Sequence, residues 1–84
     1  MYEVKAVTAL PGHQLDVEFR DGLRGRVSLK DRLFGPMFEP LREEAMFAQV
    51  SVDEYGAICW PNGADLAPDA LHRQTQAEAL QQTR

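Results

Sequence analysis

The stretch that decides the fold is Val50 to Leu71, VSVDEYGAICWPNGADLAPDAL. It reads as a strand, a tight turn, a second strand, a Pro-Asn-Gly corner and a short helix begun by Pro68. A three-residue hairpin loop at 54–56, with Gly56 in the left-handed conformation, sets a single register. The facing pairs are then Asp53 with Ala57, Val52 with Ile58, Ser51 with Cys59 and Val50 with Trp60.

This register places four apolar side chains on one face of the hairpin, namely Val50, Val52, Ile58 and Trp60. A loop of different length would scatter them over both faces, because side chains alternate along a strand. Pro61 cannot donate to a ladder and Asn62-Gly63 is a turn dipeptide, so the strand must stop just after Trp60. The only tryptophan therefore marks the edge of the core.

The length of 84 residues indicates one small domain over residues 1–73, with residues 74–84 as a C-terminal tail that extends the last helix. A hydrophobic fraction of 44% is too high for intrinsic disorder, so the chain should fold. The order of elements predicts an α+β fold. It is a small antiparallel sheet built from β-hairpins, with two or three short helices, the last of them C-terminal.

No window approaches the apolar length of a membrane span, and the N-terminus lacks the pattern of a signal peptide. We therefore expect a cytoplasmic protein without a membrane partner. The lone Cys59 excludes an internal disulfide, and His13 and His72 lie far from it in sequence. We expect no metal and no cofactor, because no pair of these residues has ligand spacing.

Charge is divided along the chain, whose net charge is -4. Residues 20–32 carry +3, from Arg20, Arg24, Arg26, Lys30 and Arg32 against Asp21 and Asp31. Residues 39–69 carry -6, from Glu39, Glu43, Glu44, Asp53, Glu54, Asp65 and Asp69 against Arg42. One basic and one acidic patch would favour head-to-tail association or a charged partner.

The N-terminal half predicts three strands. In residues 3–10, Val4, Ala6, Thr8 and Leu10 share one face, but Val7 lies on the other, so a bulge or burial on both sides would be needed. Residues 14–19 alternate clearly, and a second loop of the same kind at 20–22 would place Phe19 opposite Leu23, Val17 opposite Gly25 and Leu15 opposite Val27. On the outer face, Glu18 meets Arg24 and Asp16 meets Arg26. We expect one sheet that holds both hairpins, with residues 34–47 packed on its apolar face.

Short helices are predicted between the hairpins. Ser28 should cap a helical turn that ends before Phe34-Gly35-Pro36. Pro40 should begin a helix of about two turns with Leu41 and Ala45 on its inner side. Five side chains are predicted to form core contacts rather than a ligand pocket: Phe34, Met37, Phe38, Met46 and Phe47.

The tail QTQAEALQQTR has few apolar residues and should fray unless something holds it. We expect the helix that starts at Pro68 to continue through Ala77 and Leu80, with these two residues touching the sheet or a second copy. The small core and the opposite charges favour a homodimer.

No nucleophile elbow, phosphate-binding loop or dinucleotide fingerprint is present, and turn or cap roles explain the isolated acids, so we expect no enzyme. Nucleic-acid binding is a lesser alternative. A phosphate backbone would have to follow Arg20, Arg24, Arg26 and Lys30, although carboxylates face two of these arginines.

Three patterns carry a resemblance: V-x-x-V-x-x-L near the start, L-x-V-x-F-x-D-G-x-x-G-x-V from Leu15 to Val27, and F-x-x-V-x-V-D-x-x-G-x-I-x-W-P-N-G-x-D-L-x-P-D-x-L from Phe47 to Leu71. The chain resembles the small bacterial family called domain of unknown function 2442 over residues 4–72. The resemblance implies a compact α+β domain with no assigned activity, often encoded beside another small protein in a toxin-antitoxin-like arrangement. Some members carry a helix-turn-helix domain after this one, but only residues 73–84 follow His72, where the family often has an aromatic residue.

The leading hypothesis is a non-enzymatic, regulatory or antitoxin-like module that binds a protein, such as a small protein encoded nearby. The alternatives are a DNA-associated regulator that uses the Arg24 and Arg26 face, and a small-ligand binder or enzyme around Trp60, Asn62 and Asp65. These five residues form the candidate interaction surface.

Overall fold

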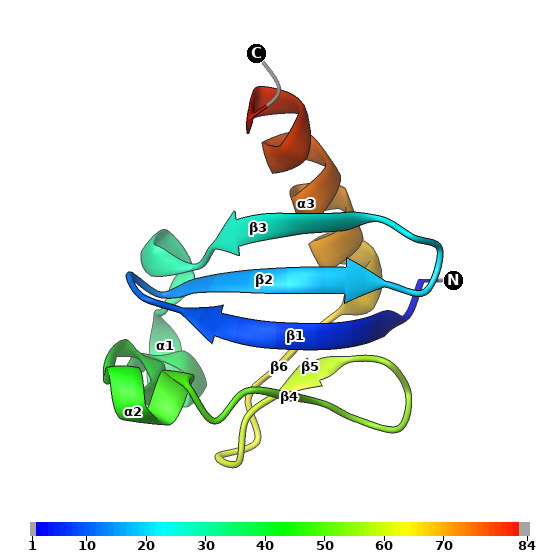
Figure 1. The fold of residues 1–84 in the computed structure, drawn as a ribbon. Helices are drawn as coiled ribbons and strands as arrows, with labels where there is room; N and C mark the ends of the chain where they lie inside the picture. The colour runs from blue at the N-terminus through cyan, green and yellow to red at the C-terminus, as the bar shows by residue number, and fades with distance from the viewer. Residues whose placement is uncertain (1, 83–84) are drawn as a thin grey trace.

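The computed structural model describes the backbone of residues 2–82 and the side chains of residues 2–79. Two three-stranded antiparallel sheets form the domain (Figure 1), which confirms the predicted α+β class. The first sheet has the order β1-β2-β3 and the second has the order β4-β5-β6. Their strands are β1 (Val4–Leu10), β2 (Gln14–Phe19), β3 (Arg24–Ser28), β4 (Ser51–Val52), β5 (Ile58–Cys59) and β6 (Asp65–Leu66).

The register of the first sheet is the predicted one. Leu15 pairs with Val27, Val17 with Gly25, Asp16 with Arg26, and Glu18 with Arg24. The uncertainty in β1 is resolved by a bulge, because the pairing with β2 shifts between Val4 and Ala6. The bulge reverses the faces, so that Val7 and Ala9 pack against the core while Ala6 and Thr8 are exposed.

The second sheet contains the hairpin that decides the fold. Ser51 pairs with Cys59 and Val52 with Ile58, as predicted. The expectation of a single sheet was wrong. A backbone hydrogen bond from Val4 N to Gly56 O (2.8 Å) connects the two sheets, but no ladder continues from β1 to β4 over the described residues.

Strand β6 was not predicted from the sequence, in which Pro61-Asn62-Gly63 was interpreted as a corner that ends the strand. Residues 61–63 form a third loop of the same kind, in which Trp60 N donates to Ala64 O and Gly63 has a positive φ of 94°. The chain therefore turns back and pairs Cys59 with Asp65. One hairpin device occurs three times in the domain.

Four short helical segments connect the sheets: η1 (Lys30–Arg32), α1 (Gly35–Phe38), η2 (Glu39–Arg42) and α2 (Glu44–Phe47). The predicted two-turn helix from Pro40 is wrong, because Glu43 has an extended conformation (ψ 123°) that separates η2 from α2. Leu41 is buried, as expected, but Ala45 is exposed. Ser28 ends β3, and the N-cap position of η1 is Leu29, although Ser28 Oγ accepts a hydrogen bond from Lys30 N at 3.4 Å.

The aromatic and methionine cluster is only partly core. Phe47 is buried, and Phe38 and Met46 pack against the core. Phe34 (64%) and Met37 (42%) are exposed. Their assignment to the core was therefore wrong.

Helix α3 (Pro68–Gln82) crosses behind the first sheet and extends past the outer edge of β3 in the view of Figure 1. Pro68 begins it, as predicted. The α3 residues that contact the sheet are not the expected ones. Ala77 is exposed and Thr75 is buried, while the Leu80 side chain lies outside the described residues.

Trp60 lies in the core between the second sheet and the short helices. It is 3% exposed, and its indole Nε1 donates to Phe47 O at 3.0 Å. Val50, Val52 and Ile58 contribute to the same core, which confirms the face assigned from the loop length. Within residues 2–82, no helix has the length and apolar character needed to cross a bilayer.

Candidate functional site

A corner of the domain brings together the N-terminus, the β2–β3 loop and α3. His72 lies in the first turns of α3 and is buried, and its Nε2 is 2.8 Å from Asp21 Oδ2. The Tyr2 ring stacks on the imidazole with ring centroids 3.7 Å apart, and the Phe19 ring meets it edge-on. Tyr2 N also donates to Asp69 Oδ1 at 3.2 Å. Sequence positions 2, 21 and 72 are thus fixed to each other.

Asp21 supplies the negative charge at this corner. The Leu23 N–H donates to its Oδ1, and this bond together with the hydrogen bond to His72 holds the pKa of the Asp21 carboxyl below its ordinary value of 3.8. The carboxylate is therefore the form that the folded loop selects. Through Oδ1 this carboxylate accepts from Leu23 N and closes the β2–β3 loop, and through Oδ2 it holds the His72 imidazole.

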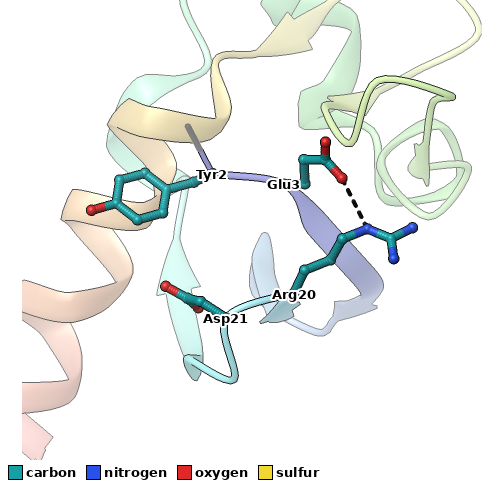
Figure 2. Close-up of a pocket in the computed structure, with 4 residues that line it drawn as sticks. All are labelled: Tyr2, Glu3, Arg20 and Asp21. Atoms are coloured by element: carbon teal, nitrogen blue, oxygen red, sulfur yellow. Dashed lines mark ion pairs between the residues drawn. The ribbon is translucent and has the colours of Figure 1, made fainter.

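A small pocket beside this corner is drawn in Figure 2. Tyr2, Glu3, Arg20 and Asp21 line a volume of about 100 Å³. Arg20 Nε and Glu3 Oε1 form an ion pair at 3.0 Å, while the Tyr2 ring points away from them toward α3 (Figure 2). This volume is smaller than the roughly 300–1,000 Å³ typical of ligand sites, so the pocket suits water molecules better than a substrate.

Tyr2 also lines a second, larger hollow. Its volume is about 340 Å³, and we call it the tyrosine hollow, lined by Tyr2, Tyr55, Ala57, Ala67, Pro68 and Asp69. Tyr55 is 76% exposed at the tip of the β4–β5 loop, and Tyr2 is 41% exposed. Ala57 and Ala67 flank the Ile58 and Leu66 pair of the second sheet, so two small side chains line the hollow together with the tyrosines. This surface is apolar, aromatic and open to a partner.

The loop that carries Tyr55 is firmly held. Asp53 Oδ1 accepts hydrogen bonds from Tyr55 N (2.8 Å) and Ala57 N (3.0 Å), and Gly56 N donates to Asp53 O. Gly56 has a φ of 80° and is buried against Glu3. The aromatic ring is therefore presented from a fixed backbone.

The candidate surface residues proposed from the sequence do not form one surface. Arg24 and Arg26 are exposed on β3, an outer strand of the first sheet. Asn62 and Asp65 belong to the β5–β6 hairpin of the second sheet, which lies on the other side of β1 and β2 (Figure 1). The arginines face Glu18 and Asp16 across the ladder, so this part of the sheet carries both signs of charge.

The residues around Trp60 are already used within the domain. The indole is buried and its N–H is paired, so Trp60 contributes to packing and offers no surface to a partner. Asn62 Nδ2 donates to Met37 O at 2.8 Å, and its Oδ1 accepts from Ala64 N at 3.1 Å. Asp65 is exposed. This geometry does not favour a ligand site at Trp60.

Sequence reasoning missed the tyrosine hollow because its residues come from positions 2, 55–57 and 67–69. One signal was available in the DEYG loop, where an aromatic residue occupies a hairpin tip that usually carries polar residues. Nothing in the sequence places Tyr2 beside it, because that contact depends on the packing of the N-terminus against α3.

Comparison with known families gives a clear assignment. The family described as "Protein of unknown function (DUF2442)" matches residues 4–77, nearly the whole chain. The chain belongs to the DUF2442 family. None of the curated proteins matches it.

A solved structure shares the fold of this DUF2442 domain. It is the "Crystal Structure of Putative DNA Binding Protein NE0471 from Nitrosomonas europaea ATCC 19718", with a TM-score of 0.80 and 23% sequence identity. The match covers 94% of this chain but only 52% of the other, so this domain spans about half of that protein. The likeness establishes a common fold.

Proposed function

We propose that this domain is a non-enzymatic, regulatory protein-binding module, which acts in the cytoplasm by holding another protein in an antitoxin-like manner. The tyrosine hollow carries the proposal. Exposed apolar patches mark interaction sites, and tyrosine is enriched at protein interfaces. The toxin-antitoxin-like gene arrangement implied by the family resemblance makes a small protein encoded nearby the first partner to test.

Two features make the tyrosine hollow suitable for binding. Tyr55 and Tyr2 can each cover a large area of a partner while fixing only two side-chain torsions. The hydrogen bonds from Asp53 already order the loop of Tyr55, so little backbone freedom is lost when a partner binds. Rigid aromatic residues of this kind commonly contribute the largest share of binding energy.

The test is affinity capture from the organism that encodes the chain, followed by identification of the retained protein. A Tyr2→Ser/Tyr55→Ser double variant should lose that protein. The matched control is Phe34→Ser, which removes an aromatic side chain that is 64% exposed and lies outside the tyrosine hollow. The proposal is contradicted if the parent, the double variant and the Phe34→Ser variant all retain the captured protein equally.

Light scattering of the purified protein at several concentrations completes this test. A homodimer that dissociates in the Tyr2→Ser/Tyr55→Ser variant would identify a second copy as the partner. A homodimer unaffected by both substitutions would place self-association elsewhere on the domain.

A second candidate is association with DNA. It is favoured by the shared fold with the protein from Nitrosomonas europaea and by the exposed Arg24 and Arg26. The carboxylates of Glu18 and Asp16, opposite these arginines in the ladder, weaken it, because their negative charge opposes the approach of phosphate. Binding to random duplex DNA at low and high salt discriminates between the candidates, since phosphate contacts weaken steeply as salt rises.

A further inference from the structure

The outer edge of β3 has backbone groups that point out of the sheet. Phe19 N donates to Leu23 O and Leu29 N donates to His13 O, so the odd-numbered residues of this segment direct their backbone toward β2. Because backbone groups alternate along an antiparallel strand, those of Arg24, Arg26 and Ser28 face away from β2. β3 is an end strand of its sheet, so this edge is not followed by another strand.

Helix α3 already covers one end of this edge. Ser28 N donates to Glu78 Oε1 (3.4 Å), and Gln74 Nε2 donates to Ser28 O (3.1 Å). These two side chains supply the acceptor and the donor that a neighbouring strand would supply. Among the backbone of residues 2–82 and the side chains of residues 2–79, no hydrogen bond reaches the backbone N–H or C=O of Arg24 or Arg26. The open part of the edge is therefore the segment 24–26.

Helix α3 also extends over the space beside this segment. It packs on β3 through Thr75, close enough that a Cβ on Gly25 would lie 2.9 Å from Thr75 Cγ2 and 4.0 Å from Ala79 Cβ. Its C-terminal half continues past the edge of the sheet (Figure 1). A strand added beside β3 would thus have its inner side chains under the helix. The site has a cover as well as an open edge.

Charge indicates which strand would fit. On the occupied side of β3, Glu18 and Asp16 face Arg24 and Arg26. A strand on the open side would meet the same two arginines. The added strand could also be β3 of a second copy, paired antiparallel so that the exposed faces of both sheets are continuous. Its arginines would then lie near Arg24 and Arg26, which is unfavourable because like charges repel across a ladder.

We propose that the open edge of β3 binds an extended, acidic segment of a partner protein by strand addition. Two acidic residues at alternate positions face Arg24 and Arg26, and a small apolar residue between them faces Gly25 under α3. Backbone hydrogen bonds to residues 24 and 26 give affinity, and the two charge pairs give selectivity. This surface does not include the tyrosine hollow, so either proposal can fail without the other.

The test uses a capped peptide, STDVETS, whose central DVE repeats the pattern that β2 already presents to β3. Its controls are the basic peptide STKVKTS and an STDVETS peptide N-methylated at the amides that would donate to β3. Binding is followed by NMR of the full chain, and exchange of the Arg24 and Arg26 amides with solvent is measured. STDVETS should protect both amides and bind about tenfold more tightly than STKVKTS, and N-methylation should abolish the protection.

Charge reversal supplies the second readout. Arg24→Glu/Arg26→Glu should invert the preference so that STKVKTS binds better, while Lys5→Glu, on the opposite outer strand, should leave the preference unchanged. The proposal is overturned if STDVETS does not bind at millimolar concentration. It is equally overturned if the Arg24 and Arg26 amides stay unprotected at saturation, if the N-methylated peptide binds as well, or if the double reversal leaves the preference intact.

Discussion

The first sheet (β1–β3) and the second sheet (β4–β6) use the same loop in different surroundings. At 20–22 and at 54–56, the glycine N–H donates to the residue before the loop and the glycine has a positive φ. A methyl group on Gly22 would meet open space among the described residues, whereas one on Gly56 would lie 2.6 Å from Glu3 Cβ. The loop chemistry is therefore local, but the cost of changing it depends on what packs against it.

The ladders differ as well. The strands of the first sheet are five to seven residues long, whereas each strand of the second has two residues. So few backbone bonds cannot hold a sheet alone, and side-chain packing must supply the rest. The second sheet should therefore be more sensitive to the loss of a single buried side chain.

The largest effect is expected at Trp60. Trp60→Ala should lower the free energy of unfolding by about 3–5 kcal/mol, because it removes a buried aromatic ring and leaves Phe47 O with only the longer hydrogen bond from Val50 N (3.3 Å). Urea denaturation measures this, and Tyr55→Ala, at a residue 76% exposed, is the control that should stay within about 0.5 kcal/mol. If the thermal midpoint of Trp60→Ala lies within a couple of degrees of the parent's, the second sheet does not depend on this side chain.

The two loop glycines give the most direct comparison of the sheets. Gly22→Ala and Gly56→Ala should each lose about 1–2 kcal/mol from the unfavourable backbone conformation. Gly56→Ala should lose a further ~1 kcal/mol or more, because its methyl group meets Glu3, including Cα at 3.0 Å. Paired urea titrations test the difference. Equal losses would show that the surroundings of the loops do not matter.

Gly25 tests the contact between β3 and α3. Gly25→Ala should cost about 1–2 kcal/mol, because the new methyl group lies 2.9 Å from Thr75 Cγ2. Thr75→Ser removes that Cγ2 and keeps the hydroxyl that donates to Leu71 O. A double-mutant cycle should therefore show that the second substitution recovers part of the loss. If the two stability losses are strictly additive, α3 moves away from the new methyl group instead.

The smallest effect concerns pH. The folded-state pKa of Asp21 is lowered by the Leu23 N–H and then by His72, so its contribution to stability is complete above the ordinary value of 3.8. It is lost as pH falls from there through the lower folded pKa. Asp21→Asn should be less stable than the parent near pH 6, and the gap should narrow in this acid range. Denaturation midpoints measured from pH 2 to 6 test this, and a gap that stays constant would remove the carboxylate from the explanation.

Much of the fold could be predicted because loop length and alternation act over a few residues. The pairs Val52 with Ile58 and Leu15 with Val27 follow from counting around a glycine. Strand β6 was missed although Pro61-Asn62-Gly63 has the same spacing, since Pro61 was taken as the end of pairing and not as the first residue of a loop. The division into two sheets was missed because it depends on how distant strands meet.

The candidate site was predictable only where it is local. The outward positions of Arg24 and Arg26 follow from alternation in β3. The tyrosine hollow and the corner at His72 depend on Tyr2 reaching α3, a contact between residues separated by almost the whole chain. Trp60 was assigned both to the core and to a surface. Burial resolves this conflict in favour of the core.

The corner formed by Tyr2, Asp21 and His72 has a consequence for the order of folding. Each hairpin closes over a few residues, so the entropy lost in closing it is small. The hydrogen bond from Tyr2 N to Asp69 joins positions 67 residues apart, so it can form only after the intervening chain has become compact. We expect β2–β3 to be protected early during refolding and the corner to close last. Pulse-labelling hydrogen exchange would show this as late protection of the Tyr2 amide relative to the amides of Gly25 and Val27.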